Sequence, residues 1–427
     1  MPLRDHPKRL EFNDEVHARP PESLRAPIRI SYLALLVGDE TRERGWKCVQ
    51  DLAARYGVTP PDAHSDHFSA DLGPFRLKCE RHTEFLRFKF IVSGIGDSYF
   101  CDAVIEAVPR DWLATLPGEL IVAANVTIAP EREQWLDFDR HSAESFDGNN
   151  LVGASIAGGA ATAITDFRVY PDGFSRLLVF DRTMTPRQTG RMIQRLLEME
   201  TYRILALMAL PIARALSPVL TASERELTDI TQILVHARDR DEPILFERLT
   251  RLAAEIESKQ SQSHYRFEAA AAYHNLVRRR IAELREERIP GLQTFKEFIE
   301  RRLAPAMDTC QSAAAQHELL SQRLARATQL LSTRVDLTRQ AQNQRLLASM
   351  NRRANLQLRL QETVERLSVA AISYYIVGLV GYAAKGAKAA GWHLDTDIVM
   401  AVSIPIVIAA IALALHRFRR TNEHEVP

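Results

Sequence analysis

Two long stretches without a charged side chain lie near the C-terminus, and they constrain the fold more than any other feature. Residues 367–384 read LSVAAISYYIVGLVGYAA and residues 398–415 read IVMAVSIPIVIAAIALAL. A helix of about 18 residues is about 27 Å long, close to the roughly 30 Å of a bilayer's hydrocarbon core. Buried core helices are the alternative for such runs. The pattern predicts two transmembrane helices joined by a short turn at 385–397.

The charges that flank these stretches predict their orientation. Lys and Arg are enriched on the cytoplasmic side of membrane helices. Arginines lie outside both spans, whereas the connecting segment carries two lysines and two aspartates: Arg352, Arg353, Arg359, Arg366, Arg417, Arg419 and Arg420 outside, and Lys385, Lys388, Asp395 and Asp397 between. We therefore expect a multi-pass membrane protein with both termini cytoplasmic and residues 416–427 as a basic tail.

Residues 185–366 are rich in Ala, Leu, Arg, Glu and Gln, a composition typical of helices. Thr185-Pro186 is a helix start, and Pro290-Gly291 marks a turn. Pro211 and Pro218 interrupt the apolar run at 203–220, which favours a buried, kinked helix over a third span. Apolar residues recur every three or four positions between Leu320 and Val364, as one face of a coiled or packed helix requires. We expect a helical stalk that continues into the first span and forms homo-oligomers.

Residues 1–184 predict an α+β domain. Strands are expected at 28–37, 85–92, 119–128, 160–170 and 174–180, from β-branched, aromatic and alternating residues. Helices are expected at 42–56 and 102–116, and Pro171-Asp172-Gly173 predicts a hairpin turn between the last two strands. The fold class is thus an α+β domain followed by an all-α, coiled-coil stalk and a two-helix membrane hairpin.

Few residues in this domain suggest chemistry. Polar clusters at Glu15, His17 and Arg19, and at His82 and Glu84, are the candidate ligand-binding residues, with an ordered loop network as the alternative. His64 and His67 beside Asp62 and Asp66 have a spacing that permits metal binding, but no further ligand pair supports it. The glycines of 153–160 lack the order of a P-loop or a dinucleotide site, which favours a loop or close backbone packing. We expect no catalytic residue, no metal and no cofactor.

The overall composition excludes some classes of protein. Lys and Arg number 55 against 54 Asp and Glu, which argues against a nucleic-acid partner because such proteins carry a basic excess. The four cysteines, Cys48, Cys79, Cys101 and Cys310, form no paired motif. They indicate free thiols in a reducing compartment.

Several segments resemble an uncharacterised bacterial family of membrane-anchored proteins, described as a domain of unknown function. They are NDEVHARP at 13–20, ERHTEF at 80–85, GNNLVGASIAGGAA at 148–161, TDF at 165–167 and GRMIQRLLEMETYRILALMALPIARAL at 190–216. The resemblance covers nearly the whole chain. It implies a proteobacterial inner-membrane protein without an assigned activity or family catalytic residues.

The layout also resembles, more distantly, the CorA-type magnesium channels, which join an α/β cytoplasmic domain to a helical stalk and two C-terminal spans. Those channels end the first span in Tyr-Gly-Met-Asn, whereas residues 380–384 here read VGYAA. Three functions follow as expectations. The first is a non-enzymatic, membrane-anchored scaffold or interaction protein. The alternatives are a CorA-like cation channel and a ligand-binding or enzymatic N-terminal domain tethered to the membrane.

Overall fold

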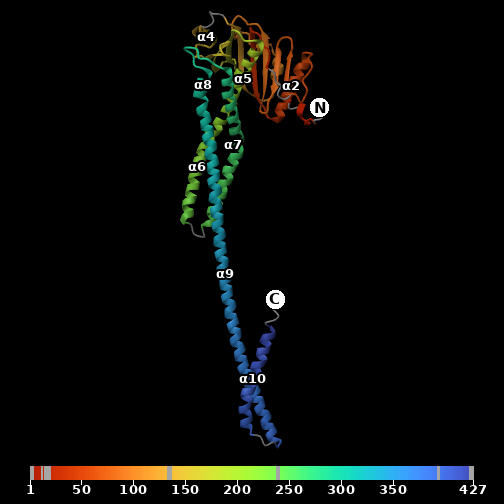
Figure 1. The fold of residues 1–427 in the computed structure, drawn as a ribbon, viewed down its shortest axis with the longest axis vertical. Helices are drawn as coiled ribbons and strands as arrows, with labels where there is room; N and C mark the ends of the chain where they lie inside the picture. Colours follow the sequence, from red (N-terminus) through yellow and green to blue (C-terminus); the bar gives the residue numbers. More distant parts are fainter. Residues whose placement is uncertain are drawn as a thin grey trace. The chain divides into compact units, whose positions relative to one another are not determined.

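A computed structural model describes residues 4–10, 13, 21–131, 137–236, 241–391 and 395–422. The chain forms two compact units. The first comprises Met1–Ala237 and Pro243–Thr328, and the second comprises Arg238–Glu242 and Gln329–Pro427. Each is described separately below, and Figure 1 shows the elements of both.

The first unit is built on one eight-stranded sheet with the order β2-β3-β4-β1-β5-β8-β7-β6. Every neighbouring pair is antiparallel except β5 and β8, which run parallel. The strands are β1 (Ile28–Leu36), β2 (His67–Asp71), β3 (Arg76–Arg81), β4 (Phe85–Ser93), β5 (Glu119–Pro130), β6 (Val152–Ile156), β7 (Ala161–Val169) and β8 (Ser175–Asp181). The expected mixture of strands and helices in an N-terminal domain is thus confirmed.

All five predicted strands are present, but three others escaped prediction. β2 and β3 read HFSAD and RLKCER, and their charged residues hide the strand period. β6 lies in the glycine-rich segment and pairs with β7. A Cβ added to Gly153 would lie 2.7 Å from the carbonyl oxygen of Ala163. Close backbone packing, one of the two expectations for this segment, therefore explains Gly153.

Helix α2 (Asp39–Arg55) covers one face of the sheet and is confirmed, with Trp46, Val49 and Leu52 buried. The helix predicted at 102–116 is wrong. The chain there forms a 3₁₀ turn, η1 (Val104–Ala107), and one helical turn, α3 (Arg110–Leu113). Proline disfavours helical backbone in the residue before it, and Val108, which precedes Pro109, is extended at φ −86° and ψ 134°.

Two predicted turns and caps are confirmed. β7 and β8 form a hairpin across 171–173, where Gly173 takes φ 85°, a conformation that glycine adopts without strain. Thr185 caps α5 (Pro186–Leu207), and its hydroxyl accepts a hydrogen bond from the Gln188 amide. The apolar run breaks at Met208, after which α6 (Ala209–His236) begins. The ring of Pro211 would clash with the Leu207 carbonyl in a continuous helix.

Three helices pack side by side away from the sheet (Figure 1). They are α6, α7 (Glu242–Leu284) and the first turns of α9 (Ala304–Ala389), and α8 (Phe295–Arg302) precedes α9. Polar contacts join each pair. Arg248 of α7 bonds Asp229 of α6 at 2.9 Å, and Arg323 of α9 bonds Glu224 of α6 at 2.6 Å. His317 of α9 contacts the Ile256 carbonyl of α7 at 3.0 Å.

The second unit consists mainly of the rest of α9 and α10 (Thr396–Asn422). α9 continues through Leu367 without a break. The two helices approach closely, since a Cβ added to Gly381 would lie 2.5 Å from the Met400 sulfur. Three helical stretches of the described chain are long and apolar enough to cross a membrane: Pro186–His236, Phe295–Ala389 and Thr396–Ala414.

Candidate functional site: a buried charged face of the sheet

Strands β3 and β4 carry apolar side chains on one face and charged side chains on the other. Leu86, Phe88 and Phe90 belong to the apolar core on the face that α2 covers. The opposite face holds four charged residues that water barely reaches: Lys78 (1% exposed), Glu80 (0%), Arg87 (3%) and Lys89 (5%). Charged side chains are almost never fully buried unless they are paired, so this face is the most unusual feature of the first unit.

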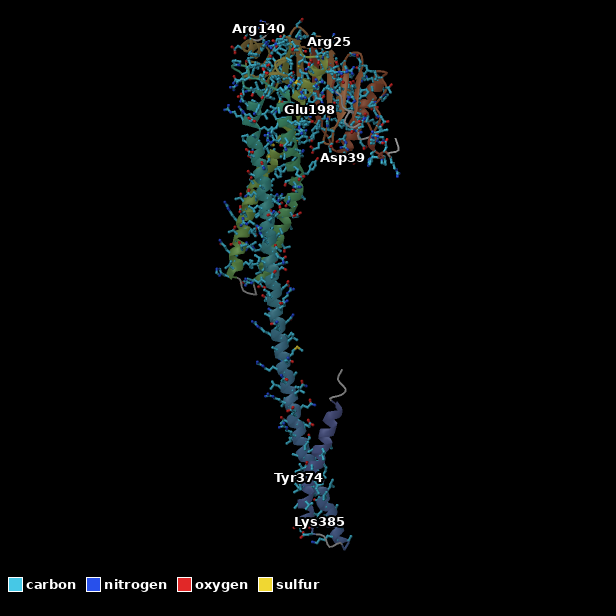
Figure 2. The ribbon with its side chains drawn as sticks, viewed as in Figure 1. Arg25, Asp39, Arg140, Glu198, Tyr374 and Lys385 are labelled. Carbon is cyan, nitrogen blue, oxygen red and sulfur yellow. The ribbon has the colours of Figure 1, made fainter. Side chains whose placement is uncertain are left out.

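Helices α5 and α7 cover the charged face. The hydroxyls of Tyr32 on β1 and Thr201 on α5 lie 2.7 Å apart. Arg280 of α7 reaches the same region, where its Nε donates to Glu198 of α5 at 2.5 Å. Figure 2 shows Glu198 where the helices meet the sheet. Polar groups from two strands and two helices therefore meet beneath α5.

Glu198 is the centre of an ion-pair network. Its carboxylate accepts hydrogen bonds from Arg87 Nη1 at 2.9 Å and from Gln194 at 2.8 Å, in addition to the bond from Arg280. Arg87 also pairs with Glu80. Burial alone would raise the pKa of Glu198, but Arg87 and Arg280 outweigh it and hold that pKa at about 2. The carboxylate is therefore ionised throughout the physiological range.

The two lysines on this face differ in their partners. Lys78 lies 3.2 Å from Glu80, whereas the side-chain amine of Lys89 forms no hydrogen bond or ion pair with the described residues. Burial lowers the pKa of Lys78 to about 8. Burial, together with the nearby cations Arg87 and Lys78, lowers the pKa of Lys89 well below its ordinary value. Both amines thus release protons far more readily than a lysine in water.

Glu22 lies at the edge of this face, beside the two outermost strands. It accepts hydrogen bonds from Ser69 of β2 at 2.6 Å and from Arg76 of β3 at 3.0 Å. Burial would raise the pKa of Glu22, but the bond from Ser69 and the charges of Arg76 and Lys78 lower it. The segment that follows is fixed to α5, because the Leu24 amide donates to the Pro186 carbonyl at 2.9 Å.

Of the predicted site residues, Glu84 serves as an anchor for α7. Its carboxylate accepts hydrogen bonds from Tyr265 at 2.7 Å, Arg266 at 2.9 Å and Tyr273 at 2.8 Å. Burial opposes ionisation, but these three bonds lower the pKa of Glu84. The ordered polar network that the sequence offered as an alternative fits Glu84 better than a free ligand-binding side chain.

His82 lies next to this anchor but faces a different environment. Its ring stacks on Phe85 with centroids 4.3 Å apart, and its Nε2 lies 3.8 Å from Glu80 Oε2. It also lines an open groove of about 700 Å³ between α2 and the turn from β3 to β4, with Arg42, Trp46, Lys47, His64 and Arg81. Glu15, His17 and Arg19 lie outside the described residues, so their convergence with His82 stays a prediction.

In the segment 62–67, whose His and Asp spacing would permit metal binding, the carboxylates bind other groups of the protein. Asp66 pairs with Arg81 at 2.8 Å, and the Asp62 carboxylate accepts a hydrogen bond from the His64 amide at 2.8 Å. Among the residues that the structure describes, no group of three or more His, Cys, Asp or Glu is arranged to hold a metal ion.

Sequence reasoning missed Lys78, Arg87, Lys89 and Glu198 as site residues. Alternation in FLRFKFIV is typical of a strand with one face in water, and it assigns Arg87 and Lys89 to that face. The apolar helix α5, which follows the sheet in the sequence, is the signal that could have revealed this burial, because such a helix must pack against a face of the sheet. The charge of that surface was visible in the sequence, but its burial was not.

The segments that suggested a family converge in the fold. ERHTEF and METYR meet in the edge-to-face contact of Phe85 with Tyr202, whose ring centroids lie 6.4 Å apart. Arg87, two residues after ERHTEF, pairs with Glu80 of that segment and bonds Glu198, which directly precedes METYR. GNN and TDF meet where the Asn149 amide donates to Asp166 at 2.9 Å.

Comparison with known proteins found one match. No curated protein and no solved structure is significantly similar to this chain. The family model described as a protein of unknown function, DUF3422, matches residues 4–422, and the chain therefore belongs to the DUF3422 family.

Proposed function

We propose that this protein is a membrane-anchored scaffold, held to the bilayer by the end of α9 and by α10. The exposed apolar surface of α10 carries this proposal. The most apolar window of Thr396–Ala414 has no buried residue, and Ile398, Ile406 and Leu413 are each more than half exposed. Soluble proteins rarely expose an apolar surface of this extent, whereas hydrocarbon solvates it.

The geometry of the second unit supports a hairpin in the bilayer. Small residues allow membrane helices to approach closely, and Gly381 meets Met400 in this way. Ala384, one turn away from Gly381, is 7% exposed. Packing through small residues, without an ion pair, is the contact expected between helices in lipid.

The apolar run of α5 and α6 has a different environment. Leu205, Ala206 and Ala209 are fully buried within the first unit, and the apolar window of Pro186–His236 is one third buried, against none for α10. The charged residues of this run are paired within the first unit, Glu198 with Arg87 and Arg203 with Glu200. We propose two membrane spans rather than three for these reasons.

We further propose that the scaffold self-associates through the middle of α9. Leu346, Met350, Leu360 and Val364 are each more than half exposed. At about 100° per residue they lie within one sector of the helix, which Arg353 and Gln357 share, with Asn355 on the opposite side. A helix with such an apolar stripe is stable in water when a second helix covers it, and a second copy supplies an identical stripe.

Alkaline carbonate extraction of membranes that contain the full-length protein tests the anchor. The protein is expected in the pellet, and a reporter fused after Pro427 is expected to be cytoplasmic. Release into the supernatant would overturn the anchor, and a periplasmic reporter would overturn the orientation.

Cysteine cross-linking on the same membranes tests self-association. With Cys101 replaced by Ser, Met350→Cys is expected to form disulfide-linked dimers, and Asn355→Cys serves as the matched control on the opposite side of the helix. Equal cross-linking of the two variants, or none of either, would contradict pairing through this stripe.

A further inference from the structure

Three tyrosines of α9 lie within the proposed first span, residues 367–384, and their side chains are exposed. Tyr374 is 79% exposed, Tyr375 73% and Tyr382 75%. The rings of Tyr374 and Tyr375 meet edge to face with centroids 6.2 Å apart. Among the described residues, none of the three hydroxyls takes part in a hydrogen bond. Figure 2 shows Tyr374 within the span and Lys385 just beyond it.

Two of these hydroxyls lie at a depth where a bilayer supplies no partner. The nearest charged residues on either side are Arg366 and Lys385. At about 1.5 Å per residue, Tyr375 lies about 14 Å from the first and about 15 Å from the second along the helix axis, near the middle of the hydrocarbon. Tyrosine is enriched instead at the interfaces, where its hydroxyl meets water. Because a hydroxyl in an apolar environment is costly without a hydrogen bond, Tyr374 and Tyr375 need a partner that lipid tails lack.

Gly378 lies between these tyrosines on the surface of the helix. At about 100° per residue, Tyr374 lies about 40° to one side of it and Tyr375 about 60° to the other. A Cβ added to Gly378 would meet no atom within 4 Å, whereas one added to Gly381 would lie 2.5 Å from the Met400 sulfur of α10. Glycine destabilises a helix interior relative to alanine, but it allows membrane helices to approach closely. Gly378 therefore indicates a second helix on a face that α10 leaves uncovered.

This face continues the exposed apolar stripe of α9 that lies outside the proposed span. α9 runs from Ala304 to Ala389 without a break. Tyr375, Gly378 and Tyr382 fall within the same sector of about 80° as the residues of the stripe, which are Leu346, Met350, Leu360 and Val364. Gly381 and the buried Ala384 lie outside that sector. A surface that pairs two copies of α9 in water thus extends into the lipid on one continuous helix.

We infer that the first span binds the same span of a second copy through Tyr374, Tyr375, Gly378 and Tyr382. The inference rests on the proposed anchor, and it extends the proposed pairing of α9 into the bilayer. Gly378 allows the two helices to approach, and the tyrosines flank it on both. A tyrosine hydroxyl can donate and accept a hydrogen bond, so two identical faces satisfy each other's hydroxyls without a charged group.

Cysteine cross-linking of the full-length protein in membranes tests the contact, with Cys101 replaced by Ser and copper phenanthroline as the oxidant. Ala371→Cys lies in the inferred face, about one turn before Tyr375, and is expected to form disulfide-linked dimers. Ala383→Cys is the matched control, because Ala383 is an exposed alanine about 120° further around the helix. Gly378→Ile is expected to lower cross-linking of Ala371→Cys to the level of this control, whereas Ala383→Ile should leave it unchanged.

Met350→Cys in the same membranes separates this contact from the stripe outside the span. Cross-linking at residue 350 with none at residue 371 would overturn the inferred contact and leave the anchor and the stripe in place. Equal cross-linking of Ala371→Cys and Ala383→Cys, or no effect of Gly378→Ile, would overturn it as well. Release of the protein by carbonate would overturn the anchor and the inference together.

A second measurement isolates the hydroxyls and needs no introduced cysteine. Full-length copies fused to donor or acceptor fluorescent proteins are reconstituted in liposomes, and energy transfer is followed as the protein-to-lipid ratio changes. Loss of one hydrogen bond between membrane helices weakens association by about threefold. Tyr374→Phe combined with Tyr375→Phe removes two such bonds from a dimer, and the dissociation constant is expected to rise by about tenfold. An unchanged constant would show that the hydroxyls face lipid and would overturn the inference.

Discussion

Arg87 on β4 donates to the Glu198 carboxylate on α5 at 2.9 Å, and both side chains are nearly inaccessible to water. This bond joins the sheet to the helix that covers it at a place where most proteins use apolar contacts. Arg280 extends the link to α7. One carboxylate therefore links both helices to the sheet.

Glu198→Ala is expected to lower the free energy of unfolding by about 3–5 kcal/mol, because it leaves Arg87 and Arg280 buried without their common partner. Chemical denaturation followed by circular dichroism of the full-length protein in detergent measures the change. Glu144→Ala is the control, since Glu144 pairs with Arg140 on the surface of α4 (Phe138–Ser145) and such pairs contribute about 1 kcal/mol or less. Equal losses in the two variants would contradict the central role of Glu198.

The buried lysines predict that stability rises with pH. Because burial lowers the pKa of Lys78 to about 8, the unfolded chain binds more protons than the folded one between pH 8 and 10. The lysines' contribution to the free energy of unfolding should increase over that window, by at most about 1.4 kcal/mol per pH unit for each lysine. The thiols of Cys79 and Cys310, whose pKa values burial raises, contribute in the opposite direction. Above it the effect reverses, because burial raises the pKa of Tyr32 to about 12, so that tyrosine ionises more readily in the unfolded chain.

Thermal unfolding at several pH values in detergent checks this dependence. Lys78→Met and Lys89→Met should each flatten the rise, whereas Lys47→Met should retain it. A pH dependence that is the same in the wild type and in both lysine variants would show that the lysines keep ordinary pKa values in the fold.

The sequence predicted the parts of the fold that have a local cause. The strand at 28–36 follows from its β-branched and aromatic residues, and the start of α5 follows from Thr185-Pro186. The missing strands had no such signal. β2 and β3 carry charges that only their pairing and the cover of α5 explain, because burial of a strand face is a tertiary property.

The candidate site was predicted less well than the fold. Glu84 was predicted as a ligand-binding residue with a polar network as the alternative, and its hydrogen-bond partners lie 181 to 189 residues away on α7. Periodicity contains no information about contacts at that distance. Lys89 looked like an ordinary solvent-facing residue of an alternating strand, and its isolation becomes visible once the positions of Glu80, Glu198 and Lys78 are known.

Glu84→Ala is expected to loosen α7 locally. The carboxylate holds three side chains of that helix, and hydrogen bonds to a charged group contribute about 1.5–3 kcal/mol. Hydrogen exchange of residues 262–275 should therefore accelerate by about tenfold or more, while exchange in the paired strands β5 and β8 stays unchanged. Tyr265→Phe removes a single, exposed partner and should have a smaller effect. Unchanged protection of 262–275 in Glu84→Ala would show that packing alone fixes the helix.

Ile406→Arg tests whether α10 lies in hydrocarbon. Ile406 is 61% exposed near the middle of the apolar stretch, and an arginine at the centre of a membrane helix costs about 2.5–3.5 kcal/mol on insertion scales. The membrane-integrated fraction, measured by carbonate extraction, is expected to fall. Leu346→Arg, at a similarly exposed position of α9 outside the predicted span, should remain fully integrated because residue 346 lies outside the hydrocarbon. Equal integration of the two variants would mean that bilayer hydrocarbon does not surround residue 406, and the anchor would then have to lie elsewhere in the chain.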